Sequence, residues 1–376
     1  MHDAIMWQDK RTIDICQELK GESEFVYKRT GSKINPVFTA PKITWLKRYE
    51  PEIYNQAYKM IVIPDYVLFL ITGKFMTDYT YGSRSSLMNI ESLQWDEELL
   101  NLFEVDREKL CELVPQGSVA GHSTRQFYEM TGLAKGTPVI SAGGDQQCAA
   151  LGAGVIENGS IQVTTGTGSF IIASSDTLQL DPQMRAICNI SAVPDKYVLE
   201  SSILTTSTVS SWFLIIFTIT NKTLKRCLKK LLPHQSGQRA VELSSFSRKG
   251  IPDWNPLAKG MFFNVTLESD RGDFSRSILE SIALEISENI DVMKELLGSV
   301  SSISVAGGLT RSNLLIKFKR MYMASELNYQ QIAKQLHLVL GFRQQSRSVC
   351  LNLTGRHSLD RNMGWKEISL NRSRKM

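Results

Sequence analysis

The sequence predicts a mixed α/β protein with two domains. The chain has 376 residues, more than one domain of ordinary size holds, so two hydrophobic cores are expected. Short β-branched segments that end at glycine pairs alternate with longer segments whose apolar residues recur at helical spacing. The composition, 42% hydrophobic and 22% charged, excludes wholesale disorder. The sequence contains no apolar run of about 18 residues, so no membrane-spanning helix is predicted.

Three segments are expected to be helical. Residues 8–30 are predicted as a helix of mixed charge, and residues 40–75 as helices with aromatic anchors. The longest amphipathic helix is expected over residues 273–297. Its apolar positions, which recur at helical spacing, are Phe274, Ile278, Ile282, Leu284, Ile286, Ile290, Met293 and Leu297.

Strands are expected where β-branched runs stop at glycine turns. A strand, a glycine-rich turn and a second strand in succession predict a β-hairpin whose backbone is exposed at the bend. This pattern occurs over residues 160–173, around Gly166-Thr167-Gly168. The other expected strands are residues 137–142 before Gly143-Gly144 and residues 302–306 before Gly307-Gly308, with a helix expected from Ser312.

The net charge of +5 is concentrated in two segments. Residues 214–250 carry eight Lys or Arg and one acid, and residues 317–376 carry twelve and three, which leaves −11 on the rest of the chain. A pair of basic patches for nucleic acid is one interpretation, but aromatic residues are sparse there. Two solvated surfaces are the simpler interpretation, so no nucleic-acid partner is expected.

The cysteines and the amino-terminal residues indicate an intracellular protein. Residues 1–9 lack the basic and then apolar layout of a signal peptide. The six cysteines contain no C-x-x-C pair, so neither a zinc site nor a disulfide framework is predicted, and no other metal site is assigned. We therefore expect a cytoplasmic protein with reduced thiols at Cys16, Cys111, Cys148, Cys188, Cys227 and Cys350.

Asp145 is the candidate catalytic residue. It follows a predicted strand and the pair Gly143-Gly144, which allows a sharp turn and the close approach of a ligand. A carboxylate there could accept a proton from a substrate hydroxyl, as phosphoryl transfer requires. The alternative is structural, with Asp145 as the N-cap of a helix.

The turn Gly166-Thr167-Gly168 is the candidate phosphate site. Its backbone N–H groups and hydroxyl could hold a phosphate, although an ordinary hairpin turn has the same composition. No Gly-Lys-Ser/Thr follows, so it is not a Walker loop. Gly307-Gly308 ends a strand before a helix, where nucleotides commonly lie against bare backbone. The occurrence of all three motifs in this order is the stronger signal.

These motifs resemble the FGGY carbohydrate kinases, with the first half closest to the glycerol kinase branch. The resemblance covers about residues 1–213 and 250–314. The segments that carry it are AIMWQDKRT (4–12), VFTAPKITWL (37–46), TDYTYGSRSSLMNIESLQWDEELL (77–100), GGDQQCAALGAG (143–154), TTGTGSF (164–170), DWNPLAKGMFF (253–263), DFSRSILESIALE (273–285) and AGGLTRSNL (306–314).

The resemblance implies two actin-like, ribonuclease-H-like ATPase domains that close around ATP and a sugar or polyol. Residues 1–152 would form the substrate domain without its first part, and residues 153–316 the nucleotide domain. In this family Asp145 matches the catalytic base and Gln146 a polar substrate contact. The nucleotide contacts are expected at Gly166, Thr167 and Gly308, with ATP and Mg²⁺ as cofactors.

The sequence departs from the family pattern in several places. The chain begins where family members are well into their first domain, so the early phosphate hairpin is absent and the first domain is expected to be incomplete. Val37 replaces a usual substrate-contacting tyrosine, and Asn264 replaces a usual glycine. Ser207 and Ser211 replace a nucleotide-site glycine and glutamine.

The two basic segments are expected to be frameshifted. Plausible codons for residues 319–324 and 334–341, started one base earlier, encode phrases that suit the family, including its Thr-Ala-Leu-Gly-Ala motif. Residues 214–250 would then be divergent and residues 317–376 a divergent basic tail. Shifted codons scramble apolar periodicity, so both segments should pack poorly and the second domain should be disrupted at its C-terminal end.

We therefore expect an ATP-dependent kinase of a sugar or polyol hydroxyl, as a truncated or impaired copy. The alternative is a catalytically inactive remnant or a regulatory sugar-binding protein, and a basic nucleic-acid-binding protein is the third hypothesis. The expected partner is a small sugar or polyol, with no membrane partner, and assembly into a homo-oligomer is left open.

Overall fold

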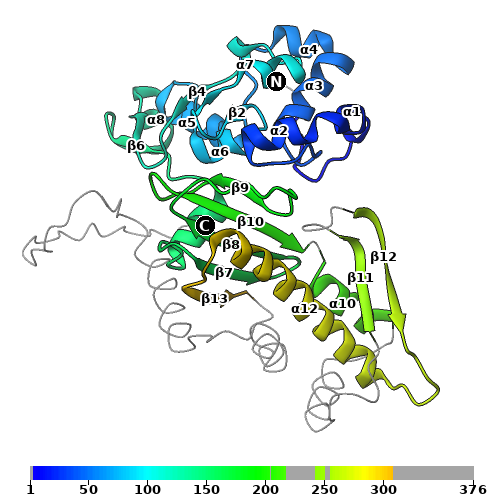
Figure 1. Ribbon diagram of the computed structural model, residues 1–376. Helices are drawn as coiled ribbons and strands as arrows, with labels where there is room; N and C mark the ends of the chain where they lie inside the picture. The colour runs from blue at the N-terminus through cyan, green and yellow to red at the C-terminus, as the bar shows by residue number, and fades with distance from the viewer. Residues whose placement is uncertain (1–2, 204, 217–241, 250–254, 308–376) are drawn as a thin grey trace, which may run out of the picture. The chain divides into compact units, whose positions relative to one another are not determined.

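A computed structural model describes residues 3–203, 205–216, 242–249 and 255–307 (Figure 1). Two of the sequence predictions, Gly308 and the helix from Ser312, lie outside these residues. The described part of the chain contains no helix that is both long and apolar enough to cross a membrane.

The two basic segments are largely outside the described residues. Residues 217–241 and the whole of 317–376 are among those not described. The backbone of Glu242–Lys249 forms strand β11, which pairs antiparallel with β12 (Asn255–Phe263). The pairing contains register shifts between Ser244 and Ser247 and between Ser247 and Lys249, and the expectation that the basic segments pack poorly stays a prediction.

Helices dominate the first part of the chain. A hydrophobic cluster there joins Val26 of α2 (Ser23–Thr30), Ile43 of α3 (Thr39–Tyr49), Tyr54 of α4 (Pro51–Gln56), Leu99 of α7 (Glu97–Leu102) and Phe103, which follows α7. The elements in order are α1 (Ile13–Glu18), a 3₁₀ turn (Leu19–Glu22), α2 (Ser23–Thr30), α3 (Thr39–Tyr49), α4 (Pro51–Gln56), α5 (Ile63–Thr72), β1 (Met76–Asp78), α6 (Tyr79–Ser83), β2 (Met88–Asn89), β3 (Gln94–Trp95), α7 (Glu97–Leu102), a 3₁₀ turn (Arg107–Lys109), β4 (Glu112–Val114), β5 (Val119–His122), α8 (Arg125–Thr131), β6 (Pro138–Ile140) and α9 (Asp145–Gly152).

The helix predicted over 8–30 is interrupted, whereas the helices predicted over 40–75 are present. The first segment forms α1 and α2, which are separated by the 3₁₀ turn Leu19–Glu22; this turn contains Gly21, a residue that weakens helices because of its backbone freedom. The second segment forms α3, α4 and α5, and Pro51 begins α4 at a position where its missing N–H costs no hydrogen bond.

A five-stranded sheet forms the second part of the chain. Its order is β13-β7-β8-β10-β9, with β13 parallel to β7 and the other pairs antiparallel. The predicted hairpin over 160–173 is confirmed as β7 and β8. The bounds are β7 (Ser160–Thr165), β8 (Ser169–Ser175), β9 (Ile187–Ile190), β10 (Tyr197–Ile203), α10 (Ser207–Ile216), α12 (Arg271–Leu297) and β13 (Ser302–Ala306).

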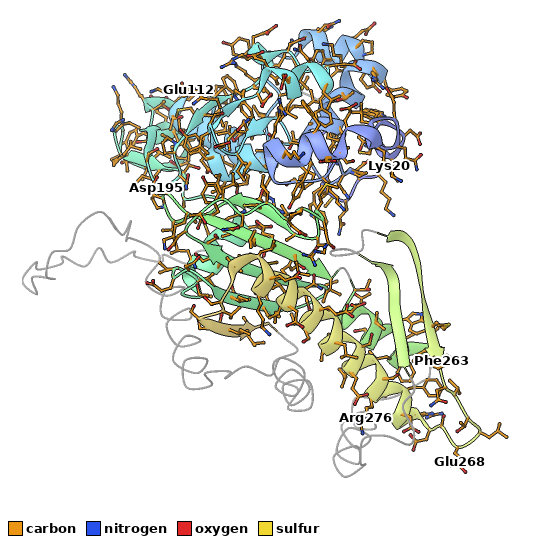
Figure 2. The ribbon with its side chains drawn as sticks, in the orientation of Figure 1. Lys20, Glu112, Asp195, Phe263, Glu268 and Arg276 are labelled. Atoms are coloured by element: carbon orange, nitrogen blue, oxygen red, sulfur yellow. The ribbon has the colours of Figure 1, made fainter. Side chains whose placement is uncertain are left out.

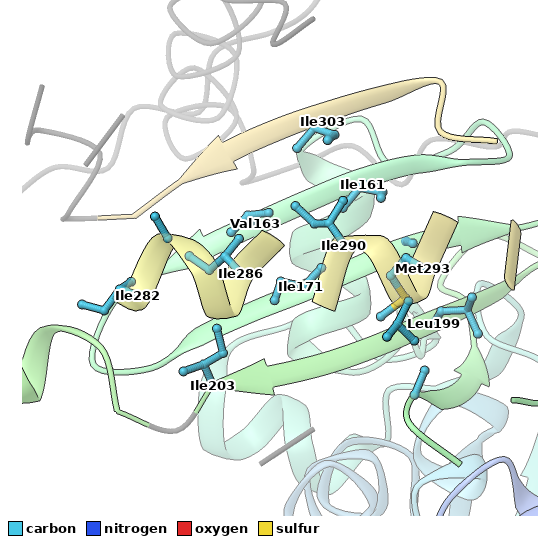
Figure 3. Packing of buried hydrophobic residues seen from close by; sticks show 14 of the residues in the cluster. Ile161, Val163, Ile171, Leu199, Ile203, Ile282, Ile286, Ile290, Met293 and Ile303 are labelled. Atoms are coloured by element: carbon cyan, nitrogen blue, oxygen red, sulfur yellow. The ribbon is translucent and has the colours of Figure 1, made fainter. Parts of the chain in front are cut away.

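The predicted long helix, α12, covers one face of this sheet (Figure 3). Ile171 of β8 belongs to the cluster under α12, whereas its neighbour Ile172 packs with Ala150 of α9. Since successive side chains of a strand point to opposite faces, α9 lies on the other face. The residues that pack between α12 and the sheet include Ile282, Ile286, Ile290 and Met293 against Ile161, Val163, Leu199, Ile203 and Ile303.

A loop between β12 and α12 contains an uncommon backbone conformation at Asn264. Figure 2 labels Phe263 at the end of β12, Glu268 in the loop and Arg276 in α12. Asn264 has φ of +60°, a left-handed conformation that asparagine adopts more readily than most residues. Asparagine can therefore occupy the position at which the family resemblance led us to expect glycine.

Hydrogen bonds from the first part of the chain hold the edge strand β9. Gly31 accepts from the backbone N–H of Cys188 (2.9 Å), and the hydroxyl of Tyr27 donates to the carbonyl of Ala186 (2.7 Å). The amide of Gln116 donates to the carbonyl of Ser191 (2.7 Å). These bonds pair a backbone N–H group of β9 and the carbonyl groups of the residues on either side of it, as buried backbone polar groups require.

Candidate functional site

Asp145 begins α9 and is exposed to solvent. Gly144 is the N-cap of α9, so the structural alternative, in which Asp145 is the N-cap, is not what the structure shows. The carboxylate of Asp145 accepts from the backbone N–H of Gln146 at 2.8 Å. A negative charge in this first turn lies at the end of the helix where the macrodipole favours it.

The loop that precedes Asp145 is held by Thr80 and Asp78. The Thr80 hydroxyl accepts from the backbone N–H of Gly144 at 2.8 Å and also bonds to the Asp78 carboxylate. Asp78, which is fully buried, accepts from the hydroxyl of Ser141 as well. The loop is therefore attached to the Asp78 carboxylate at two residues, directly at Ser141 and through Thr80 at Gly144.

A second polar cluster joins α9 to the five-stranded sheet. Glu200 of β10 pairs with the guanidinium of Arg84. The same carboxylate accepts from the side-chain amides of Gln147 (2.9 Å) and Asn189 (3.0 Å). A Cβ at Gly144 would lie 2.4 Å from the carbonyl oxygen of the Gln147 side chain. Only glycine therefore fits at position 144 while Gln147 keeps this orientation.

Asp145 shares its electrostatic surroundings with Arg84 and Tyr81. The charge of Glu200 raises the pKa of Arg84, and Asp145 acts in the same direction. Burial raises the pKa of Tyr81 to about 12, with smaller contributions from the charges of Asp78 and Asp145. The guanidinium of Arg84 is paired with Glu200, and a third of the Arg84 side chain is exposed.

Gln146, the predicted substrate contact, lies next to Asp145 in the first turn of α9 and is half-buried. In the described part of the chain its side-chain amide takes part in no hydrogen bond that we observe. The prediction that it contacts a substrate stays a prediction.

The turn between β7 and β8 is attached to the residues just before and within α10. Gly166 donates its N–H to the carbonyl of Gly168 at 2.8 Å. Thr206 donates its backbone N–H to the carbonyl of Thr167 (2.9 Å) and its hydroxyl to the carbonyl of Gly166 (2.9 Å). These bonds fix the turn, and the Thr167 residue is exposed at its tip.

Gly307 lies against the end of β7. Its φ is +100°, and a Cβ there would lie 2.2 Å from the carbonyl oxygen of Thr165, so only glycine fits. Because β13 and β7 are parallel, with Ala306 opposite Thr164, both glycine motifs lie at the same end of their strands. Gly308 is outside the described residues, but its neighbour Gly307 adjoins the turn between β7 and β8.

The two groups of predicted residues are connected through one sheet, because Gln147 of α9 binds Glu200 of β10 and the Gly166-Thr167-Gly168 turn joins β7 to β8. Glu200 pairs in register with Ile172 of β8, and Ile203 with Ser169, the first strand residue after the turn. Ile172, opposite Glu200, is therefore three residues along β8 from the end of the turn, a distance of about 10 Å. We observe no direct contact in the described structure between Asp145 or Gln146 and the turn.

Sequence reasoning did not assign roles to Asp78, Thr80, Arg84 or Glu200. Asp78, the last residue of the short strand β1, has the position of an N-cap, and its carboxylate accepts from the N–H groups of Thr80 and Tyr81 in α6. That local pattern could have been recognised. The contacts of Thr80 with Gly144 and of Arg84 with Glu200 span 64 and 116 residues, and a single sequence gives no signal for them.

The fold and the two glycine-containing sites define a two-part α/β architecture of the actin-like ATPase class. The model for the N-terminal domain of the FGGY family of carbohydrate kinases matches residues 1–152, and that for the C-terminal domain matches residues 161–337. The chain belongs to the FGGY family of carbohydrate kinases.

Glycerol kinases are among the similar curated proteins. One from Trichodesmium erythraeum is 31% identical over 335 residues, which cover 85% of this chain and 65% of the relative. One from Thermococcus onnurineus is 30% identical over 333 residues, with the same two shares. The chain thus spans slightly less than two thirds of the length of these relatives.

Solved structures confirm the fold. The superposition on the xylulose kinase from Rhodospirillum rubrum has a TM-score of 0.79 at 20% sequence identity. It covers 92% of this chain and 79% of the xylulose kinase chain. The glycerol kinase of Plasmodium falciparum with ADP gives 0.78 at 24% identity and covers 93% and 72%. At these identities the similarity establishes the two-domain actin-like architecture.

Proposed function

We propose that this protein transfers a phosphoryl group from ATP to a hydroxyl of a sugar or polyol. The observation that carries the proposal is the exposed carboxylate of Asp145 at the start of α9, on a loop held by buried hydrogen bonds. The family, and relatives named as glycerol kinases, support this reaction class. Structures named as xylulose kinases leave the acceptor open between polyols and sugars.

In the proposed reaction Asp145 accepts the proton of the acceptor hydroxyl as the oxygen attacks the terminal phosphorus of ATP. The N-terminus of α9 and the guanidinium of Arg84 place positive charge near this carboxylate. Gln146, adjacent and half-buried, would orient the acceptor through its side-chain amide.

The residues of the β7–β8 turn fit a nucleotide phosphate. A Cβ at Gly166 would meet only the carbonyl oxygen of Gly168, at 4.0 Å, so a ligand can approach this backbone closely. Thr167 is exposed, and Gly307 packs tightly beside the turn. We assign Gly166, Thr167 and Gly308 to ATP binding.

Mg²⁺ would enter with the nucleotide. The described residues contain no group of three His, Cys, Asp or Glu side chains that could hold a metal ion by themselves. Mg²⁺ in such enzymes is commonly held by substrate phosphates, water and one or two carboxylates. When bound, the ion would neutralise the phosphate charge that repels the acceptor oxygen.

The test is a panel of acceptors with ATP and Mg²⁺. Purified protein is incubated with glycerol, xylulose or gluconate, or without acceptor, and ³¹P NMR detects the phosphorylated product while ADP is measured in parallel. The proposal predicts one ester product formed in equal amount to ADP. Folded protein that forms no ester from any acceptor contradicts the proposal, and acceptor binding without transfer would favour a regulatory sugar-binding protein.

We also propose residues 1–152 as the substrate domain and residues 153–316 as the nucleotide domain. The two family matches support this division. The reaction needs no nucleic-acid or membrane partner, and we propose the cytoplasm, where ATP is available, as its location.

A further inference from the structure

The hydroxyl of Thr80 has a fixed hydrogen-bond direction. A carboxylate can only accept, so the Thr80 hydroxyl donates its proton to Asp78. Its lone pairs then accept from the N–H of Gly144, at 2.8 Å. The order of donors is therefore Gly144 to Thr80 to Asp78, a chain in which each bond polarises the next.

The Asp78 carboxylate holds the loop at a second point. Its Oδ1 accepts from Thr80, and its Oδ2 accepts from the hydroxyl of Ser141. Asp78 and Thr80 have no exposed surface, so water does not replace either contact. Hydrogen bonds to a charged acceptor are also the stronger kind.

Packing restricts the same loop. A Cβ at Gly143 would lie 3.3 Å from the Cγ2 atom of Thr80, and Gly143 has φ of +117°. The methyl group of Thr80 thus lies under Gly143 while its hydroxyl binds Gly144. Residues 141–144 are attached at both ends and supported in the middle, and Asp145 is the next residue.

We propose that Thr80, together with Asp78 and Ser141, is a positioning residue that sets the place and direction of the Asp145 carboxylate. This inference rests on the proposed function, in which Asp145 accepts the acceptor proton. None of the three residues needs to touch the substrate. A displacement of about 1 Å at a reacting group can cost about a hundredfold in rate, so the loss of one loop contact should reduce turnover.

Substitutions at Thr80 separate positioning from packing. Thr80→Val keeps the shape and removes the hydroxyl, whereas Thr80→Ser keeps the hydroxyl and removes the methyl group. The control is Thr44→Val in α3, which also removes a fully buried hydroxyl, one that donates to the carbonyl of Phe103 at 2.7 Å. Both valine variants should lose stability, since each leaves a buried partner unsatisfied, and Thr80→Val should lose more because its hydroxyl donates to a charged acceptor.

The expected kinetic result is a fall in kcat of about tenfold to a hundredfold for Thr80→Val, with KM for ATP unchanged. Thr80→Ser should retain most of kcat, and Thr44→Val should retain it fully. A second readout needs no catalysis: hydrogen–deuterium exchange at the Gly144 amide should accelerate at least tenfold in Thr80→Val and stay unchanged in Thr44→Val.

Two results would overturn the inference. One is Thr80→Val with unchanged kcat and unchanged exchange at Gly144. The other is an equal fall of kcat in Thr44→Val, which would assign the effect to lost stability. If the unmodified protein phosphorylates no acceptor, the proposed function fails, and Gly144 exchange alone decides whether Thr80 holds the loop.

Discussion

Glu200, in the middle of strand β10, forms an ion pair with Arg84, a residue 116 positions earlier that follows helix α6. The Glu200 side chain is 10% exposed and that of Arg84 33%. Gln147 of α9 binds the same carboxylate. This carboxylate therefore connects the sheet, the helix that begins at Asp145 and the segment after α6.

Removal of the Glu200 charge should destabilise the protein. Glu200→Gln leaves the Arg84 cation without an anionic partner. It also places an amide N–H group opposite the donors of Gln147 and Asn189. The free energy of unfolding should therefore fall by about 2–4 kcal/mol. The measurement is the free energy of unfolding in denaturant. Glu129→Gln is the control, because its ion pair with Arg125 is exposed and should contribute at most about 1 kcal/mol. Equal effects of the two substitutions would contradict the buried role of Glu200.

Gly31 should tolerate alanine much less than Gly117 does. Both have similar positive φ, +71° and +75°, so alanine costs about 1–2 kcal/mol of backbone strain at each. At Gly31 the new Cβ would also lie 2.1 Å from the carbonyl oxygen of Cys188, whereas nothing lies within 4 Å at Gly117. Overpacking should add about 1–3 kcal/mol at Gly31 alone.

Unfolding in denaturant measures both alanine variants. A larger loss for Gly31→Ala supports the close contact between this glycine and strand β9. Equal losses would show that Cys188 is not held against Gly31.

Asp65 should make stability depend on pH. Burial raises the pKa of its carboxyl from 3.8 to about 6, so the folded state retains a proton that the unfolded state releases between pH 4 and 6. The stabilising effect of this proton is complete below pH 4 and is lost as the pH rises through 6. The shift corresponds to about 3 kcal/mol.

The test compares the protein with Asp65→Asn, which is neutral at every pH and keeps an acceptor for the N–H of Val62. From pH 4 to pH 7 the variant should gain about 3 kcal/mol relative to the unmodified protein. Asp14→Asn, at an exposed site in α1, should show a nearly constant difference. A constant difference for Asp65→Asn as well would refute the raised pKa.

Local patterns predicted the elements near the candidate site. The hairpin around Gly166-Thr167-Gly168, the strand before Gly307 and the helix under the sheet follow from turn chemistry and periodicity. Helix ends were less predictable, because Gly144 rather than Asp145 became the N-cap of α9. Either residue type is common at that position, so local sequence does not choose between them.

The contacts that support Asp145 could not be predicted from one sequence. Thr80 and Arg84 lie in a segment that we noted only for its resemblance to the family. Their partners, Gly144 and Glu200, are distant in the sequence and lie beside them in the folded chain, in which α6 packs against β9 and the loop between β6 and α9 binds Thr80. Such pairs depend on tertiary packing rather than on spacing along the chain.

The central claim is that Asp145 is the base of a phosphoryl transfer. The most direct test is kcat/KM for the best acceptor in the unmodified protein, Asp145→Asn and Asp14→Asn. Both aspartates are exposed and lie in the first turn of a helix, so the two substitutions should have similar effects on folding. The account predicts a loss of about a hundredfold or more for Asp145→Asn and less than about twofold for Asp14→Asn, whereas transfer by Asp145→Asn at the rate of the unmodified protein would contradict it.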